Sequence, residues 1–293
     1  MNKVNFILTI DVHQRENLKE ELRDMGESFD RLAIHANVLI PAILLSNDGV
    51  SNAIVRLSQK GHQIGCHGLY HDGEIELYDE MSYELQDEYI SKATSLIRNV
   101  VGYNPVCFRS PTFRLSASTI QILEKYGYTV DCSVNSQRLG LTGADYKNIS
   151  WLLAPRLPYH PSYENPYKRG NTKLLEVPTS AFVFPFMSTF LKVFGLGITK
   201  LFFKMFYLES LRNKKPIVYM GHPEDFSPSG RINKSVPFSY KLFLPSKDGF
   251  RFRYLLYERD EKKVYNNTIE LFKYIKSYPG INFVTFNQYL ESL

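Results

Sequence analysis

Short apolar runs rich in β-branched residues alternate with longer amphipathic segments along most of this chain. Two strands that are separated by a helix pair in parallel within one sheet and are joined by a right-handed crossover. The alternation therefore predicts an α/β fold with roughly six to eight strand–helix units. In a chain of 293 residues, that number is typical of a β/α barrel with parallel strands, here expected to be distorted.

The individual segments follow from apolar spacing and from end signals. Strands are expected at residues 5–12, 38–45, 61–66, 106–109, 128–132, 174–177, 216–220 and 281–285. Helices are expected at residues 18–36 with a break near Gly26, and at 48–60, 82–101, 116–126, 261–277 and 286–293. Asp48 is a candidate N-cap, and Gly102 stands where a helix-ending glycine is expected.

Two stretches interrupt the alternation. Residues 137–172 are rich in Pro, Tyr and Asn, which is typical of a long loop over one face. Residues 182–212 are crowded with Phe and Leu, but Pro185, Gly195, Gly197 and several lysines make them too interrupted to span a bilayer. We therefore expect residues 1–293 to form one catalytic domain with a long loop and an aromatic-rich helical insert.

Composition narrows the class of protein. The chain is 44% hydrophobic and 22% charged, as ordinary globular proteins are. A formal charge of +5 without a dense Lys/Arg block gives little support to nucleic-acid binding. Cys66, Cys107 and Cys132 are expected to be buried, reduced thiols. The first apolar run is too short for a signal peptide, so we expect a cytoplasmic protein, either free or peripheral at the inner face of the membrane.

Polar side chains follow five of the predicted strands. In a parallel barrel the carboxyl ends of all strands meet at one rim, so these side chains should lie close together. Caps and turns explain one polar strand end well, but they explain five strands ending in His, Asp or Arg less well. The candidate site residues are Asp11, His13, His67, His71, Arg109, Asp131 and His222.

Three of these side chains are candidate metal ligands. His67 and His71 lie four residues apart and can meet one ion, but a zinc site needs at least a third protein ligand. His13 would complete a set of three neutral nitrogen donors, which suits Zn²⁺ and leaves a position for water and a substrate carbonyl. Two alternatives stay open: His13 does not ligate and the site is weak, or Asp11 itself binds the metal.

The remaining side chains suit acid–base work. Asp11 would project to the same side as His13 and would take a proton from water at the metal. Arg109 would keep that carboxylate ionised, His222 would protonate the leaving group, and Asp131 would keep His222 charged. Backbone N–H groups in the turn after Arg109 would stabilise an oxyanion. This set predicts hydrolysis of an amide or an ester.

The motifs around these residues resemble those of the polysaccharide deacetylases, the carbohydrate esterases with a NodB-type homology domain. The resemblance covers most of the chain, through residues 9–13 (TIDVH), 67–71 (HGLYH), 108–113 (FRSPTF), 130–133 (VDCS), 175–178 (LEVP) and 219–223 (YMGHP). It implies a distorted β/α barrel and the removal of N- or O-acetyl groups from sugars. It also implies the same roles for Asp11, His67, His71, Arg109, Asp131 and His222.

The first motif departs from the family pattern. Members usually place a carboxylate ligand next to the base or two residues after it, and here His13 stands two residues after Asp11. Replacing a carboxylate by a neutral imidazole makes the site more positive, which should make a bound water more acidic.

The expected function is therefore a zinc-dependent deacetylase of a sugar, acting on a nucleotide- or lipid-linked precursor of a surface glycan. Two alternatives are an amide hydrolase with a non-sugar substrate in the same barrel family and a catalytically silent carbohydrate-binding relative. The insert has two readings as well: residues 182–206 could contact a membrane peripherally, or a helical pair could pack on the barrel.

Overall fold

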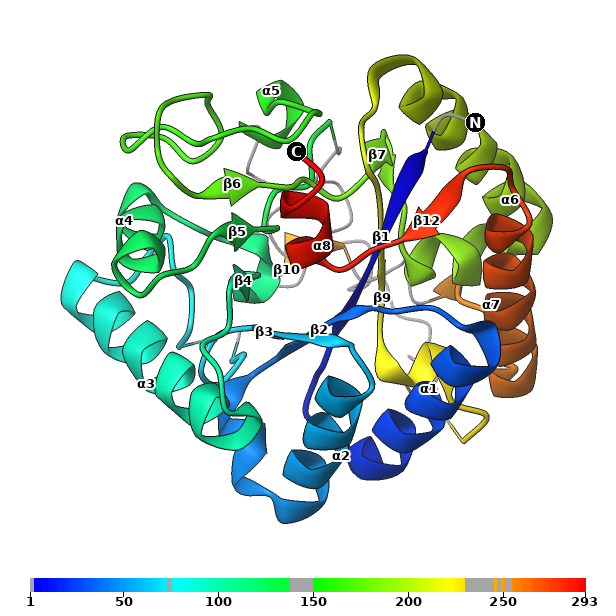
Figure 1. Cartoon of the computed structure of the whole chain (residues 1–293), viewed down its shortest axis with the longest axis horizontal. Coiled ribbons are helices and arrows are strands. Elements are labelled where there is room, and N and C mark those ends of the chain that lie inside the picture. The colour runs from blue at the N-terminus through cyan, green and yellow to red at the C-terminus, as the bar shows by residue number, and fades with distance from the viewer. Residues whose placement is uncertain (1–2, 73–74, 138–149, 230–244, 247–248, 251–254) are drawn as a thin grey trace.

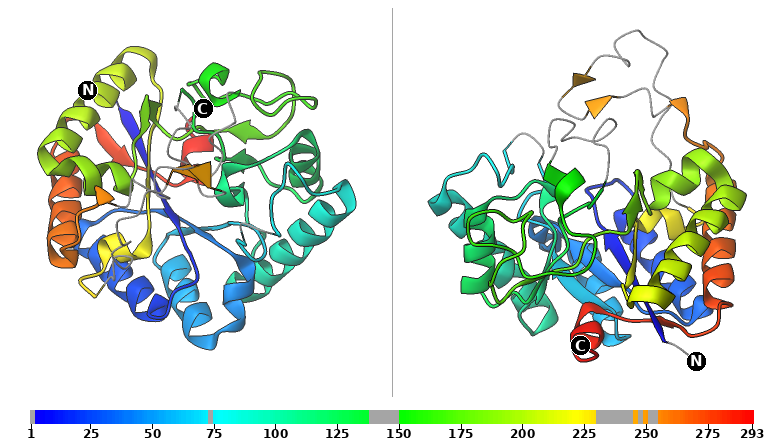
Figure 2. Two further views of the ribbon diagram at one scale, coloured as in Figure 1. Left: turned by 180° about the vertical axis from the view of Figure 1, so that it is seen from behind. Right: turned by 90° about the horizontal axis from the view of Figure 1, so that it is seen from above.

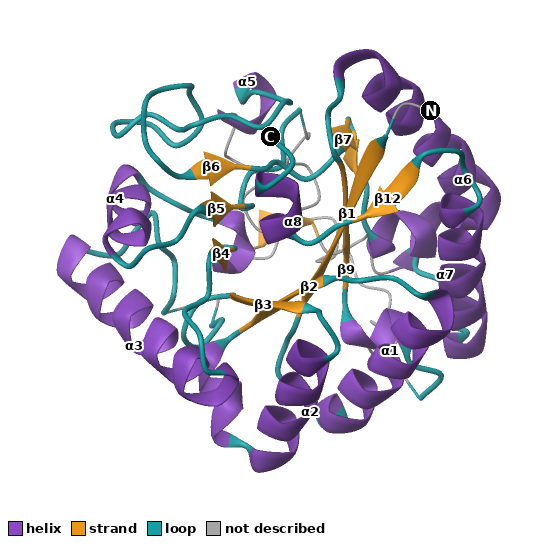
Figure 3. Cartoon of the chain, in the orientation of Figure 1, coloured by secondary structure: helices purple, strands orange, loops and turns teal. Residues whose placement is uncertain are grey.

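Parallel strands build the centre of the molecule, as the alternating pattern predicts. The protein is described here from a computed structural model, which covers residues 3–72, 75–137, 150–229, 245–246, 249–250 and 255–293. Seven strands follow one another in the order β12-β1-β2-β3-β4-β5-β6, and β9 pairs with β1. Every described pair in this sheet is parallel, which confirms the α/β class and the distorted barrel (Figures 1 and 3).

The sheet is formed by β1 (Val4–Asp11), β2 (Asn37–Ile40), β3 (Gln63–Cys66), β4 (Cys107–Phe108), β5 (Val130–Asp131), β6 (Leu175–Glu176), β9 (Ile217–Gly221) and β12 (Ile281–Phe283). The helices are α1 (Leu18–Leu32), α2 (Asp48–Gln59), α3 (Tyr83–Val101), α4 (Ala117–Lys125), α5 (Ser150–Leu153), α6 (Ser188–Asn213), α7 (Glu261–Lys276) and α8 (Phe286–Leu290). Short 3₁₀ turns are η1 (Ala42–Ser46), η2 (Pro111–Phe113) and η4 (Pro223–Phe226). Two small hairpins pair β7 (Ala181–Phe182) with β8 (Phe184–Pro185) and β10 (Pro245–Ser246) with β11 (Gly249–Phe250).

The barrel closes between β6 and β9 without a regular strand ladder. The N–H of Ser180 donates to the carbonyl of Val218 at 3.1 Å, and the N–H of Val218 donates to Ser180 Oγ at 3.0 Å. Together with the N–H of Met220, which donates to the carbonyl of Phe186 at 3.2 Å, these isolated bonds replace a strand ladder, and this is where the barrel is distorted.

Alternation along β1 separates the inside of the barrel from its outside. Phe6 and Leu8 pack outward against the helices, whereas Ile7 joins a second apolar cluster inside the barrel. Thr9 and Asp11 share the inward face with Ile7, because side chains two residues apart point to the same side of a strand. The inward face therefore changes from apolar to polar along β1.

Helix α8 covers the apolar end of the barrel (Figure 1). Its first N–H groups, from Phe286 and Asn287, donate to the side chains of Asn37 and Gln63, which begin β2 and β3. Both chain ends lie at this end of the barrel (Figure 2, right). The polar side chains consequently gather at the opposite end, where the strands finish.

Several predicted boundaries are wrong, and tertiary packing explains the one at Gly26. Helix α1 continues through Gly26 and ends at Leu32, because a Cβ on Gly26 would lie only 3.1 Å from Leu57 Cδ2, so this glycine allows close packing and does not break the helix. The strand predicted at 38–45 stops at Ile40, and η1 begins two residues later, after Pro41.

The predicted N-cap of α2 is also wrong. Asn47, and not Asp48, caps the helix, since its side chain accepts the N–H groups of Gly49 and Val50. At the other end of the next helix the prediction is confirmed: α3 ends at Gly102, whose φ of 85° is the left-handed conformation that glycine adopts readily.

The aromatic-rich insert contains the β7–β8 hairpin and α6. Helix α6 lies beside α7 on one flank of the barrel (Figure 1). Its course changes at Gly195, which has a φ of 73°. Among the described helices, none combines the length and apolar character needed to cross a bilayer. Residues 138–149 of the predicted long loop lie outside the described residues, and its described part contains α5 and short bridges such as Tyr159 to Glu176.

Candidate active site

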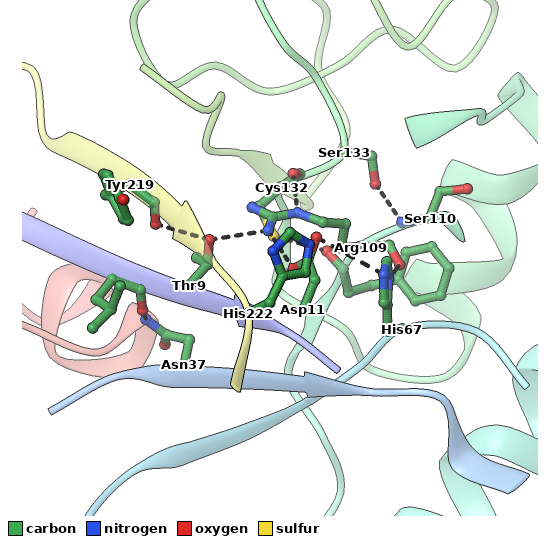
Figure 4. A network of polar contacts seen from close by, with 12 residues as sticks. Thr9, Asp11, Asn37, His67, Arg109, Ser110, Cys132, Ser133, Tyr219 and His222 are labelled. Carbon is green, nitrogen blue, oxygen red and sulfur yellow. Dashed lines mark hydrogen bonds and ion pairs between the residues drawn. The ribbon is translucent and has the colours of Figure 1, made fainter. Parts of the chain in front are cut away.

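A buried ion pair lies at the centre of the polar end of the barrel (Figure 4). Arg109 follows β4 and is fully buried, and its Nη1 donates to Asp11 Oδ1 at 2.6 Å and to Thr9 Oγ1 at 3.0 Å. Its Nε donates to the carbonyl of Cys132 at 2.9 Å. Burial opposes a charge on Arg109, but several interactions, led by the charge of Asp11 and including its hydrogen bond, together outweigh burial, and the pKa of Arg109 is raised. Asp11 is thus held beside a permanent cation.

The three histidines expected to bind a metal lie together. His13 follows β1, and His67 and His71 follow β3. Their candidate ligand nitrogens all lie within 4.8 Å of one another. The ring centroids are 4.4 Å apart for His13 and His71 and 4.5 Å apart for His67 and His71. One ion could therefore contact all three rings.

The chemistry of these imidazoles fits a divalent ion. The Nδ1 of His67 lies 2.8 Å from the carbonyl oxygen of Arg109, so this nitrogen carries the proton and leaves Nε2 as an acceptor. Burial lowers the pKa of His13, His67 and His71, and repulsion from His71 lowers the pKa of the first two further. Neutral imidazoles are the form that binds Zn²⁺. The residues present therefore suit such an ion.

A buried carboxylate that sequence reasoning missed shapes the loop that ends in His71. Glu76 accepts the N–H groups of Leu69 at 2.6 Å, Tyr70 at 2.8 Å and His71 at 2.6 Å. It also accepts the hydroxyl of Tyr78 at 2.8 Å. Three consecutive amides thus converge on one carboxylate, which we call the Glu76 cradle. The cradle fixes the backbone of a candidate metal ligand.

Gly68 is required by the same cradle. Its φ is 79°, and a Cβ at this position would lie 2.7 Å from Glu76 Oε1 and 2.7 Å from Pro111 Cγ. No side chain fits there. In the sequence, Glu76 is one of five acids between residues 72 and 80, and nothing in their spacing distinguishes it.

His222 lies on the other side of the histidine cluster and has its own set of partners. Its ring centroid is 5.0 Å from that of His13. Its Nδ1 lies 3.3 Å from Ser188 Oγ and 3.5 Å from Asp225 Oδ2, which also accepts the N–H of His222 at 2.8 Å. The other oxygen of Asp225 pairs with Lys192 Nζ at 2.5 Å, and both side chains are buried.

These partners set the charge on His222. Burial alone would lower the pKa of His222, but the hydrogen bond to Asp225 and the charges of Glu224 and Asp225 together outweigh burial, and the pKa is raised. Burial would raise the pKa of Asp225, but Lys192 and His222 hold it far below the usual range. Lys192 therefore belongs to this side of the site, although the sequence placed it among the lysines of the insert.

The structure contradicts the expected pairing of Asp131 with His222. Val130 and Cys132, the neighbours of Asp131, belong to the cluster inside the barrel. Because side chains alternate along a strand, Asp131 points to the outer face of the sheet. Within the described residues no hydrogen bond or ion pair joins Asp131 to His222, and Asp225 takes the expected place.

Asp131 instead pairs with another buried carboxyl group. Glu176 is its register partner on β6, and burial raises the pKa of both groups. The nearby charge of Asp131 raises the pKa of Glu176 further, so Glu176 holds the proton between them. The hydroxyl of Ser133 donates to Asp131 at 2.6 Å, and the N–H of Val134 donates to Glu176 at 3.1 Å. This pair supports the turn after β5.

Comparison with known proteins identifies similar sequences. A sequence profile described as "Polysaccharide deacetylase" matches residues 30–130, a range that includes His67, His71 and Arg109. A stretch of 75 residues is 33% identical to the peptidoglycan deacetylase-like protein FGM2 of Gibberella zeae and covers 26% of this chain and 21% of that protein. A stretch of 125 residues is 25% identical to the peptidoglycan deacetylase of Helicobacter pylori and covers 41% of this chain and 40% of that protein. The chain thus spans less than half of the length of either relative.

The fold extends the similarity to nearly the whole chain. The crystal structure of a Mycobacterium smegmatis protein assigned as a polysaccharide deacetylase superimposes with a TM-score of 0.62 at 14% identity. The superposition covers 99% of this chain and 90% of that one. At this level of identity the match describes the fold.

Because Glu76 fixes the backbone of the loop that ends in His71, Glu76→Gln should weaken the binding of Zn²⁺. Glutamine has one acceptor oxygen and an amide donor that would face a backbone N–H, so the loop should lose its conformation. We expect the affinity for Zn²⁺ to fall about 10- to 100-fold, measured by competition with a chromogenic chelator. Glu80→Gln, which changes an exposed acid on the same segment, is the matched control and should leave the affinity unchanged. Equal affinities for all three proteins would contradict the cradle.

Because Lys192 pairs with Asp225 in the interior, replacing Lys192 should lower the free energy of unfolding much more than replacing Lys204 of the same helix. Lys192→Met removes the buried ammonium group from Asp225 Oδ1 and leaves that oxygen without a charged partner, and we expect the free energy of unfolding to fall by about 3–5 kcal/mol. Lys204→Met removes an exposed lysine of α6 and should change it by less than about 0.5 kcal/mol. Urea unfolding measures both. Equal losses would show that the pair carries no special role.

Proposed function

Because this chain belongs to the polysaccharide deacetylase family, we propose that it is a metal-dependent hydrolase that removes an N- or O-acetyl group from a sugar. One observation supports this proposal most directly. Three neutral imidazoles meet at a point that has the Arg109-bound carboxylate of Asp11 on one side and the Asp225-bound ring of His222 on the other. Such an arrangement offers a metal site, a base and an acid around one reacting centre.

The histidines would hold the ion, and Asp11 would act as the base. His13, His67 and His71 are the proposed ligands, and their donor type favours Zn²⁺. Bound there, the ion would supply Lewis acidity that acidifies water and polarises a carbonyl group. Arg109 binds Oδ1 of Asp11, and Oδ2 lies 3.8 Å from His67 Nε2, toward the histidines. Oδ2 is thus the oxygen positioned to accept a proton from the attacking water.

His222 would act as the acid. Its raised pKa keeps a proton available near neutral pH, and Asp225 orients the ring through Nδ1. The proton passes from His222 to the sugar nitrogen or oxygen as its bond to the acyl carbon breaks. Without His222, water would have to protonate the leaving group. Water is a weak acid, so the bond to the acyl carbon would break slowly.

The turn after Arg109 would stabilise the negative oxygen of the tetrahedral intermediate. Thr112 and Phe113 adopt left-handed conformations with φ of 55° and 63°. This conformation is rare for a β-branched residue such as Thr112. The N–H of Ser110 donates to Ser133 Oγ and that of Phe113 to the carbonyl of Ser110. Of the described backbone donors in this turn, the N–H of Thr112 is left for an oxyanion.

If Asp11 is the base, replacing Asp11 should lower activity much more than replacing Asp131. Asp11→Asn should lower kcat for acetate release from N- or O-acetylated oligosaccharides by about 10²- to 10⁴-fold, because the amide cannot accept the proton. Bound zinc should stay stoichiometric, and loss of zinc would instead make Asp11 a ligand. The side chain of Asp131 lies on the outer face of the sheet, so the Asp131→Asn variant should keep most of the activity. Activity on non-sugar amides alone would favour the other type of hydrolase.

His13 is the ligand that distinguishes this chain from the family pattern. His13→Ala should lower the affinity for Zn²⁺ by about 100-fold or more, because a site with two protein ligands binds the ion weakly. Metal content after dialysis against a chelator measures the change. His35→Ala, at an exposed histidine outside the site, is the control and should retain the wild-type metal content. An unchanged affinity in His13→Ala would remove His13 from the ligand set.

A further inference from the structure

Helix α6 is apolar on two opposite faces. Its inner face packs against the strands and α7 through buried phenylalanines such as Phe202, Phe203 and Phe206. Its outer face carries apolar side chains: those of Ile198, Leu201, Met205 and Leu208 follow Gly195 at spacings of three and four residues, which places them on one side of the helix, and Phe194 lies just before this glycine. These outer side chains are Phe194, Ile198, Leu201, Met205 and Leu208, and each is between 38% and 62% exposed.

The β7–β8 hairpin extends this apolar face. Phe182, Val183 and Phe184 at its tip are 40–48% exposed. The rings of Phe184 and Phe194 lie 5.6 Å apart, so the hairpin adjoins the beginning of α6. The eight exposed residues of the hairpin and of α6 are called the outer apolar surface. Clustered apolar exposure of this kind marks an interaction site more often than scattered single residues do.

The charged residues that α6 carries along the outer apolar surface are mainly basic, and Glu258, beside Phe194, pairs with Lys263. Lys204 and Arg212 are exposed on the same helix. The sole acid in α6 is Glu209, and it pairs with Arg156 at 2.7 Å and lies 3.6 Å from Lys215. A partner that complements this surface must therefore combine apolar groups with negative charge.

We propose that the outer apolar surface binds a lipid bilayer that contains anionic lipids. Its Phe, Leu, Ile and Met side chains would enter the boundary between headgroups and acyl chains, and Lys204 and Arg212 would contact lipid phosphates. A second copy of the chain fits less well, because two copies joined through this surface would bring their basic residues together and would repel.

The outer apolar surface and the candidate active site share helix α6, so binding to a bilayer would place the site close to the membrane. Ser188, in the first turn of α6, contacts His222, and Lys192, one turn later, pairs with Asp225. The helix that binds the bilayer thus begins beside the acid of the site. If the proposed deacetylase function holds, this placement favours a substrate whose sugar is attached to a membrane lipid over a nucleotide-linked one.

Vesicle co-sedimentation at low salt tests the proposal. The wild-type protein should sediment with vesicles of equal parts phosphatidylglycerol and phosphatidylcholine, and much less with phosphatidylcholine alone. The double variant Leu201→Gln, Leu208→Gln should bind at least about tenfold more weakly. Lys204→Gln with Arg212→Gln should also weaken binding about tenfold or more on the anionic vesicles. Leu153→Gln, at a side chain of α5 that is 88% exposed, is the matched control and should bind as the wild type does.

Three results would overturn the proposal: no sedimentation of the wild type, equal binding by the Leu201/Leu208 variant, or a wild-type dimer in solution that this variant dissociates. Acetate release from a soluble acetylated sugar should be the same in the Leu201/Leu208 variant as in the wild type. Vesicle binding does not depend on this reaction, so a failed deacetylase assay with intact binding would count against the proposed function alone.

Discussion

The ion pair between Arg109 and Asp11 is the interaction on which the rest of the site depends. A buried guanidinium is tolerated only when charge and hydrogen bonds compensate for lost water, and Arg109 obtains these from residues on or just after β1 and β5. Thr9 continues the network to β9 by donating to the carbonyl of Tyr219 at 3.1 Å. The pair therefore joins three separate parts of the barrel at the level where its apolar interior ends. The same contact orients the carboxylate assigned as the base.

The parts of the fold that could be predicted from the sequence are those that local physics decides. Helix α3 is an example, because Ser82 caps its first turn and Gly102 ends it, and both signals lie within a few residues of the boundary. The break assigned to Gly26 shows the opposite case. Whether a helical glycine bends a helix or admits a neighbour depends on α2, which is distant in the sequence.

The candidate site shows a similar division. That the chosen histidines and Asp11 lie together follows from the rim of a parallel barrel, but the face on which Asp131 lies does not. Strand β5 has two residues, too few for a pattern to reveal which face is buried, and a one-residue change of phase moves a side chain to the other side of the sheet. Asp225, in contrast, lies three residues after His222 in a capping arrangement that a local pattern could have indicated.

Helix α6 connects the chemistry of the site to the surface of the molecule, and its sequence could not show how. A segment rich in Phe and Leu fits a buried helix and an interfacial helix equally well, and α6 has both a buried and an exposed apolar face. Gly195 divides α6 into a part that contacts the site and a part that carries most of the exposed apolar residues. Lys192 precedes the change of course at this glycine and holds Asp225, whereas most of the exposed stripe follows it. The outer face can therefore vary in composition without disturbing the residues that orient His222.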